Sequence, residues 1–382
     1  MSFVMRHLVG KDVFDGISMP RPSDFHAHFR QGAMLEAVVP EQVRWVKYAL
    51  AMPNTGPIRT LSEAIQYKLL LQEAAARSGI DTVDFVMTLY YTSLLTVRII
   101  EKIPSLPFPL GIKAYPPHKG ATTGSGEGVP ILDLPEVLRA MNVNGVRLLI
   151  HGESVYDRNG NELPHEERES EFMREVFPRI RDKEPELRIC LEHVSTQDGI
   201  EAVKSDNSGN TVCTLTPHHA ICSSDDFTRS WANHLRCMPI PKAPHHRDAV
   251  KEFMVSGDPR VILGTDTAPH PSKSKVGMPF HEAACGCYLP HAIAMYALVF
   301  KEANALDARF AKFACFNGPD WWNLPRPRAD DLIRIKVEHE HDIPEPTAVP
   351  EIDDIVIPLG WSEEPDRLRI GLAHAIEAEH LH

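Results

Sequence analysis

Short apolar and β-branched runs alternate with helical patterns along most of the chain, and each run ends in polar residues. The runs lie at 18–30, 48–54, 82–90, 110–115, 145–151, 188–193, 211–217 and 261–266. A helical pattern follows most of them, and the pattern at 248–255 predicts the helix that leads into the last run. Eight strand–helix units are typical of a (β/α)8 TIM barrel, so we expect this fold over residues 1–325.

Beyond residue 325 the chain becomes polar and is interrupted by prolines. We expect one further strand in this part, at 354–359. We therefore interpret 326–382 as a C-terminal extension that packs on the barrel.

Residues that can bind metals stand at the ends of several predicted strands. His26 and His28 are two positions apart in the first run, so both rings project from the same strand face. Alone, such a pair is more often solvated or simply hydrogen-bonded than bound to metal. Four more residues of suitable chemistry end later runs: Lys113, His151, His193 and Asp266. Since barrel active sites form at the C-terminal ends of the strands, we expect all six to converge.

The overall composition indicates a small-molecule enzyme rather than a partner of nucleic acid or membrane. The formal net charge is −12 at pH 7, and no Lys/Arg block offsets it. Seven cysteines, all between Cys190 and Cys315, form an odd set that does not resemble a disulfide framework. We find no membrane-spanning run and no export signal over 1–14, so we expect a cytoplasmic protein.

Four histidines, one carboxylate and one lysine exceed the roughly three protein ligands of a single catalytic zinc. This inventory favours two metal ions. A lysine ammonium repels cations, but a lysine that has reacted with carbon dioxide is an anionic carbamate with two oxygens, which can span ions about 3.5–4 Å apart. The alternatives for Lys113 are a buried ion pair with a carboxylate or a Schiff-base lysine.

Eight segments together resemble the class II dihydroorotases of the amidohydrolase superfamily, and the resemblance covers nearly the whole chain. The segments are 24–30, 51–55, 113–116 with 121–123, 149–153, 192–196, 216–219, 264–270 and 316–319. Several of them are general to the superfamily. The combination of Asn54 after Met-Pro, the adjacent Thr122 and Thr123, and Asp266 followed by Ala-Pro-His270 resembles dihydroorotases specifically.

The resemblance implies a dinuclear zinc centre and a reaction. It implies that His26, His28 and Asp266 hold one Zn²⁺, that His151 and His193 hold the other, and that N6-carboxylated Lys113 bridges both. It further implies that Asp266 acts as general base in the reversible cyclisation of N-carbamoyl-L-aspartate to L-dihydroorotate.

The resemblance also implies substrate contacts. Arg30, Asn54 and His270 would surround the substrate carboxylate, and a guanidinium fork suits that group. A surface salt bridge is the alternative for Arg30. Contacts to the pyrimidine ring would come from 237–238, including Met238, and from 285–288.

A flexible composition over 120–128 predicts a lid above the cavity. By resemblance, Thr122 and Thr123 in this segment would close over the bound ligand. An ordinary solvated turn is the alternative.

Three other functions are consistent with parts of this pattern. A dihydropyrimidinase, hydantoinase or allantoinase would keep the same six ligands but lack the carboxylate-binding set. A non-enzymatic barrel used as a binding module would be expected to lose ligands. A mononuclear deaminase-like hydrolase would leave Lys113 unmodified. The family implies a homodimer, while the Cys285-Gly-Cys287 sequence favours free thiols over a further metal site.

Overall fold

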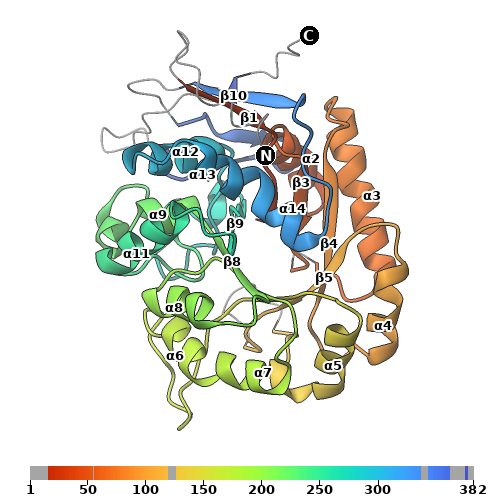
Figure 1. The fold of residues 1–382 in the computed structure, drawn as a ribbon. Coiled ribbons are helices and arrows are strands. Elements are labelled where there is room, and N and C mark those ends of the chain that lie inside the picture. The colour runs from red at the N-terminus through yellow and green to blue at the C-terminus, as the bar shows by residue number, and fades with distance from the viewer. Residues whose placement is uncertain (1–15, 55, 119–125, 337–342, 362–374, 377–382) are drawn as a thin grey trace.

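The computed structural model describes residues 16–54, 56–118, 126–336, 343–361 and 375–376. Within these residues, eight parallel strands pair in chain order and curl into a barrel (Figure 1), which confirms the predicted (β/α)8 fold. The strands are β2 (Asp24–Ala27), β3 (Tyr48–Ala51), β4 (Asp84–Tyr90), β5 (Leu110–Ala114), β6 (Leu148–Ile150), β7 (Ile189–Leu191), β8 (Thr211–Leu215) and β9 (Val261–Leu263).

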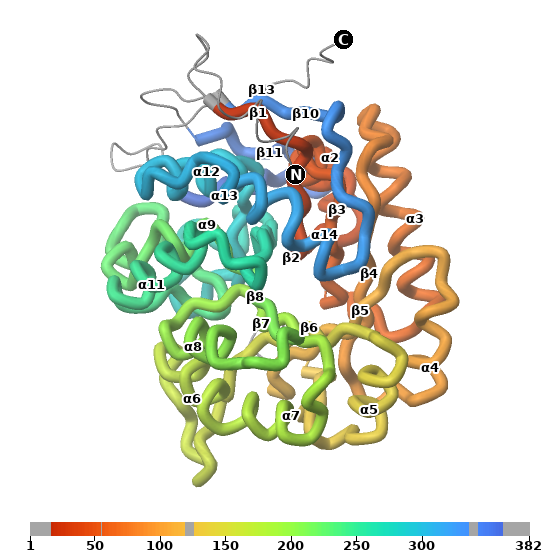
Figure 2. The backbone as a smooth tube through the Cα atoms, viewed as in Figure 1, coloured from red at the N-terminus to blue at the C-terminus, as the bar shows by residue number. Residues whose placement is uncertain are grey.

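Helices surround the barrel, and the colours in Figure 2 follow the chain once around this ring. They are α2 (Gly32–Val43), α3 (Leu61–Arg77), α4 (Val97–Lys102), α5 (Pro135–Val143), α6 (Arg168–Glu175), α7 (Phe177–Lys183), α8 (Gln197–Ser205), α9 (Pro217–Ile221), α10 (Ala232–Leu235), α11 (Pro244–Met254), α12 (Ala292–Glu302), α13 (Ala308–Ala311) and α14 (Asn317–Trp322). Short 3-10 helices lie at η1 (Ile103–Ser105), η2 (Ile131–Asp133), η3 (Ser224–Thr228), η4 (Ser272–Ser274) and η6 (Pro350–Ile352), and η5 (Lys312–Phe316) is a single π-helical turn. The helix expected at 248–255 is α11, which begins earlier, at Pro244. Among the described helices, none is long and apolar enough to cross a membrane.

Successive side chains of a strand point to opposite faces of the sheet, and this divides the buried apolar side chains of the strands between two cores. The larger core lies between the strands and the surrounding helices. The smaller one fills the barrel interior with Phe25, Leu50, Val86, Leu149, Val212 and Ile262, and with two tryptophans of α14. Arg147 and Arg188, at the starts of β6 and β7, donate to the carbonyl of Trp321, which places α14 at the N-terminal ends of the strands. The opposite end of the barrel is therefore left for polar residues.

The first predicted strand, 18–30, is wrong as a single element. The structure divides it into β1 (Gly16–Pro20), which lies outside the barrel, and β2. β1 pairs antiparallel with β10 (Leu332–Lys336) in a separate sheet that also contains β13 (Ala375–Ile376). Pro20 and Pro22 explain the break, because proline cannot donate a hydrogen bond to a neighbouring strand.

The C-terminal part of the chain packs against the barrel through two small sheets. β11 (Thr347–Val349) and β12 (Asp354–Val356) form an antiparallel pair, and β12 lies within the strand predicted at 354–359. Val349 and Val356 pack against Val38 of α2 and against Tyr288. Because β1 and β10 share one sheet, the first described strand is attached to the C-terminal extension. The division of the chain at residue 325 stays a prediction.

The barrel closes between β2 and β9 through backbone hydrogen bonds at the C-terminal ends of the two strands. The Asp266 N–H donates to the His26 carbonyl over 2.8 Å, and the His28 N–H donates to the Thr267 carbonyl over 2.9 Å. The buried Asp24 carboxylate holds both sides of this seam. It accepts the N–H of His26 and the N–H of Thr265, each over 3.0 Å, and the Thr265 hydroxyl over 2.6 Å.

Replacing Asp24 by Ala should lower the free energy of unfolding by about 3 kcal/mol, since two buried N–H groups and a hydroxyl lose their acceptor. The measurement is urea denaturation of the metal-loaded protein, with the exposed Asp81→Ala variant as control. Equal stability of the two variants would contradict the role of Asp24 in the seam.

Candidate active site

A cavity of about 320 Å³ lies at the C-terminal ends of the barrel strands. The predicted site residues that line it are His26, His28, Arg30, Asn54, His151, His193, Met238, Asp266 and His270. Lys113 lies fully buried on β5, behind this lining. Thr122 and Thr123 fall outside the described residues. The structure therefore brings together the predicted ligands and those predicted substrate residues that it describes.

A bulge in β2 influences the direction in which the His26 and His28 side chains point. The register of β2 shifts between Asp24 and Ala27, so Phe25 packs inside the barrel while Ala27 packs outward. His26 and His28 then lie on the same face, as the sequence predicts, with ring centroids 5.4 Å apart.

Each of these two histidines is oriented by a hydrogen bond to its Nδ1 atom. Nδ1 of His26 lies 2.6 Å from a Glu192 carboxylate oxygen, and Nδ1 of His28 lies 2.7 Å from the Asn54 amide oxygen. Both Nε2 atoms consequently face Asp266, at 3.3 Å and 3.0 Å from its Oδ1. Burial opposes charge on His26, but Glu192 raises its pKa, whereas burial lowers the pKa of His28 to about 4.

Three residues of the site occupy the left-handed backbone region, which non-glycine residues rarely adopt. The φ angles are 62° at Arg30, 40° at His193 and 51° at Asp266. At His193 the backbone N–H donates to the Thr214 hydroxyl over 2.7 Å. This turn matters because Glu192 occupies an inward position of the alternation, and regular extension would point His193 away from the interior.

Lys113 is an isolated amine in the barrel interior. It is 0% exposed, and its Nζ atom has no hydrogen-bond partner among the described residues. Burial lowers its pKa to about 8, against the opposing attraction of Glu192 and Asp266. The neutral amine therefore costs much less here than it would at the surface.

His151 is oriented by the Glu153 carboxylate, which in turn lies near the Lys242 ammonium. Its Nε2 atom lies 2.8 Å from a Glu153 carboxylate oxygen, and the other oxygen of Glu153 lies 3.9 Å from Nζ of Lys242. Lys242 also donates to the His165 carbonyl over 2.7 Å. This arrangement leaves Nδ1 of His151 as the atom available to a metal.

Sequence reasoning missed three groups of the candidate site. Glu192 and Glu153 contact two of the predicted ligand histidines, and carboxylate–histidine pairs of this kind are typical of metal sites. Their signal was present, because both acids lie within the segments that contain the ligands. Tyr115 lines the cavity with a buried hydroxyl that has no hydrogen-bond partner among the described residues. Nothing in the sequence separates this tyrosine from a core residue.

The predicted carboxylate-binding residues lie next to one another at the cavity. Arg30 donates from Nε to the Pro269 carbonyl over 2.6 Å, and its Nη2 atom lies 2.9 Å from Nε2 of His270. The same His270 nitrogen lies 2.9 Å from the Cys285 carbonyl. One ring nitrogen cannot accept from Arg30 and donate to Cys285 at once, so the tautomer of His270 decides which bond forms. Met238 is nearly buried in the cavity wall, and Cys285 and Gly286 from the region 285–288 also line it.

The donor set fits bound cations. One nitrogen or oxygen atom from each of His26, His193 and Asp266 lies within 4.8 Å of the other two. Nδ1 of His193 and Nζ of Lys113 are buried without a hydrogen-bond partner among the described residues, a state that is costly unless something else binds them. The three clustered residues come from both predicted zinc sets, so the assignment of each ligand to one ion stays a prediction.

Comparison with known proteins shows the family. A curated dihydroorotase from Halorhodospira halophila is 38% identical over 357 residues, covering 91% of this chain and 97% of its own length. The crystal structure of a dihydroorotase from Saccharomyces cerevisiae in complex with 5-fluoroorotic acid aligns with a TM-score of 0.82 at 28% identity, covering 94% of this chain and 98% of that one. No protein-family model matches the chain.

A more distant structural neighbour shares the fold alone. The L-hydantoinase (dihydropyrimidinase) from Arthrobacter aurescens aligns with a TM-score of 0.68 at 15% identity, covering 86% of this chain and 78% of that one. The closer agreement with the dihydroorotases, in both identity and coverage, separates the two groups.

Replacing Glu192 by Gln should weaken metal binding roughly 10–100-fold, because the neutral amide orients His26 and supports its basicity less well. The measurement is metal affinity by competition with a chelator. The matched control is Glu186→Gln, an exposed glutamate that accepts from Asn210. Unchanged affinity in the Glu192 variant would rule out this positioning role.

Proposed function

The chain belongs to the dihydroorotase family, whose members are metal-dependent cyclic amide hydrolases, and from that premise we propose how the residues of its cavity perform the reaction. The enzyme catalyses the reversible cyclisation of N-carbamoyl-L-aspartate to L-dihydroorotate. The observation that carries our assignment of the site is the convergence of the histidine, lysine and aspartate ligands beside Arg30 and His270 around one cavity.

We propose that this centre holds two Zn²⁺ ions. The ligands would be His26, His28, Lys113, His151, His193 and Asp266. Imidazole and carboxylate donors suit zinc, and the buried, unpartnered atoms of Lys113 and His193 support the assignment. When bound, the two ions supply Lewis acidity that lowers the pKa of water and polarises the amide carbonyl.

Lys113 would serve as its carbamate. The Nζ lone pair of the neutral amine forms a bond to the carbon of carbon dioxide and one proton leaves the nitrogen, which converts the neutral amine into an anion with two oxygens. Only a neutral amine can react in this way, and the lowered pKa of Lys113 favours that form. The carbamate would also remove the energetic cost of a cationic lysine near His26, His151 and His193.

Asp266 would move the proton. Its carboxylate lines the cavity and lies within 3.3 Å of two ligand histidines. In hydrolysis it accepts a proton from the attacking water and returns it to the departing ring nitrogen, and in cyclisation the same transfers run in reverse. Tyr115 offers a buried hydroxyl at the same cavity, suited to donate a hydrogen bond to substrate oxygen.

Arg30, Asn54 and His270 would bind the substrate carboxylate. A carboxylate on the Arg30 guanidinium would replace the interaction with Nε2 of His270, so that this nitrogen could keep its proton and donate. Met238 would contact the ring from the cavity wall, and Thr122 and Thr123 would close over the bound ligand. We also propose a cytoplasmic location and a homodimer, both from the family.

The direct test is an assay of the purified enzyme with dihydroorotate and carbamoyl aspartate, run beside dihydrouracil, which lacks the carboxylate. We expect turnover of the first pair only. Replacing Arg30 by Met should raise KM for dihydroorotate at least tenfold and leave metal content unchanged, while the exposed Arg98→Met control keeps the normal KM. Turnover of dihydrouracil would overturn the substrate assignment.

Replacing Lys113 by Ala should abolish binding of the metal pair, since the variant lacks the amine that would form the bridging carbamate. Added acetate or propionate should restore part of the activity by occupying the vacated space. The measurement combines metal analysis with rate at increasing acid concentration. A variant that keeps both ions and full activity would exclude the bridging role of Lys113.

A further inference from the structure

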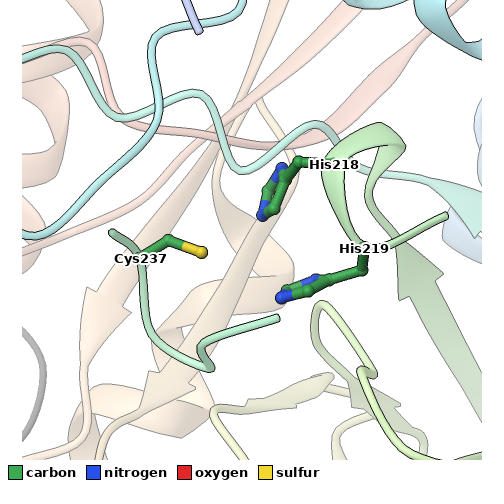
Figure 3. Close-up of side chains that lie close together, drawn as sticks. All are labelled: His218, His219 and Cys237. Carbon is green, nitrogen blue, oxygen red and sulfur yellow. The ribbon is translucent and has the colours of Figure 1, made fainter. Parts of the chain in front are cut away.

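A second group of metal-binding side chains lies outside the proposed dinuclear centre. His218 and His219 lie on α9, directly after β8, and Cys237 lies in the loop after α10. Figure 3 shows the three side chains converging, and one ligand atom from each lies within 4.8 Å of the other two. All three residues are at most 2% exposed. The dihydroorotase reaction proposed above uses none of these side chains as a ligand.

His218 is the least satisfied member of the group. Neither of its ring nitrogens has a hydrogen-bond partner among the described residues, and the residue is 0% exposed. Its ring lies against that of His219, with the centroids 4.4 Å apart. A buried imidazole with two unpaired nitrogens is costly, and a cation on one of them would remove part of that cost.

His219 and Cys237 both point at one carbonyl oxygen. Nε2 of His219 lies 2.9 Å from the Pro239 oxygen, and the Cys237 thiol donates to the same oxygen over 3.2 Å. Neighbouring ligand atoms around a tetrahedral zinc lie roughly 3.4 Å apart, as its bond lengths of about 2.0–2.3 Å require. If the His219 and Cys237 side chains moved a few tenths of an ångström away from the Pro239 oxygen, an ion could lie between them. The Pro239 oxygen could then serve as the fourth ligand.

The proton on His219 has an alternative place. Nδ1 of His219 lies 2.8 Å from the Thr216 hydroxyl oxygen, which can accept a hydrogen bond. When the ring proton moves from Nε2 to Nδ1, Thr216 satisfies it and Nε2 is free to bind a metal. A hydrogen bond to the outer nitrogen is the usual support of a metal-bound histidine.

We propose that His218, His219 and Cys237 form a third metal site, which takes a thiophilic divalent cation such as Zn²⁺ or Co²⁺. Two imidazoles and one thiolate are a donor set that zinc favours. Binding forms a bond from the cation to Sγ and releases the thiol proton to solvent, with no change in oxidation state. Burial raises the pKa of the Cys237 thiol, so uptake should weaken as the pH falls.

The ion has a route to this site. Cys237 lines the wall of the main cavity beside Met238, whereas the two histidines lie behind that wall. A cation entering through the active-site cavity would therefore reach the thiol first. Once bound, it would tie the loop that carries Met238 to α9.

The test uses cobalt, because a thiolate ligand gives Co²⁺ a strong charge-transfer absorption in the near ultraviolet. None of the six ligands of the dinuclear centre is a thiolate, so this absorption reports the third site separately from the other two. Titration of the metal-free full chain with Co²⁺ should show the absorption growing with a third equivalent. Metal analysis after gel filtration should give the same third equivalent.

Cys237→Ser should abolish the absorption and the third equivalent while the first two remain. The matched control is Cys315→Ser, because Cys315 is also buried and its thiol also donates to a proline carbonyl, that of Pro20, over 3.1 Å. His218→Gln should likewise lose the third equivalent, which keeps the test valid if the serine variant does not fold.

Three results would overturn the proposal. They are a wild-type chain without the absorption, an absorption that survives Cys237→Ser, and unchanged uptake in His218→Gln. Dihydroorotase activity and the first two equivalents are read independently, so failure of the third site leaves the proposed function untouched.

Discussion

The closure of the barrel between β2 and β9 is the constraint on which the site depends. The seam consists of backbone bonds between His26 and Asp266 and between His28 and Thr267, so the residues that close the barrel are also the predicted ligands or their neighbours. The Asp24 carboxylate holds both sides, although burial raises its pKa to about 6. Formation of the fold and alignment of the ligands are consequently one event, and a shift of either strand would separate the histidines from the aspartate.

Around this seam, the interior contains more buried acid than a barrel core tolerates without compensation. Glu192 pairs with His26, Glu153 with His151, and Asp266 lies against His26 and His28. Each acid therefore has an imidazole partner. Cations bound among these side chains would balance the remaining negative charge of the acids. The polar end of the barrel is therefore consistent with a metal-dependent enzyme, and the tryptophans of α14 help to fill the apolar part of the interior.

Much of the fold was predictable because alternation and strand–helix order are local properties of the sequence. The inward positions of His26, Lys113 and His151 follow from spacing within a strand. The sequence prediction treated 18–30 as one strand although Pro20 and Pro22 interrupt it, and the partner of β1 lies more than 300 positions away in β10, which no local pattern indicates. The contact of Glu192 with His26 could not be predicted either, since the two residues lie 166 positions apart on different strands.

The left-handed backbone conformation of Arg30, His193 and Asp266 could not be predicted from the sequence either, because glycine or asparagine is the usual residue in this conformation. At these three positions the residue that the proposed reaction needs is not the residue that would make the backbone most stable. A glycine at His193 or Asp266 would relax the main chain while removing a predicted metal ligand. Drift in a lineage that no longer needed the reaction should therefore replace these residues by glycine or asparagine early, and such replacements would mark barrels that have lost the chemistry but kept the fold.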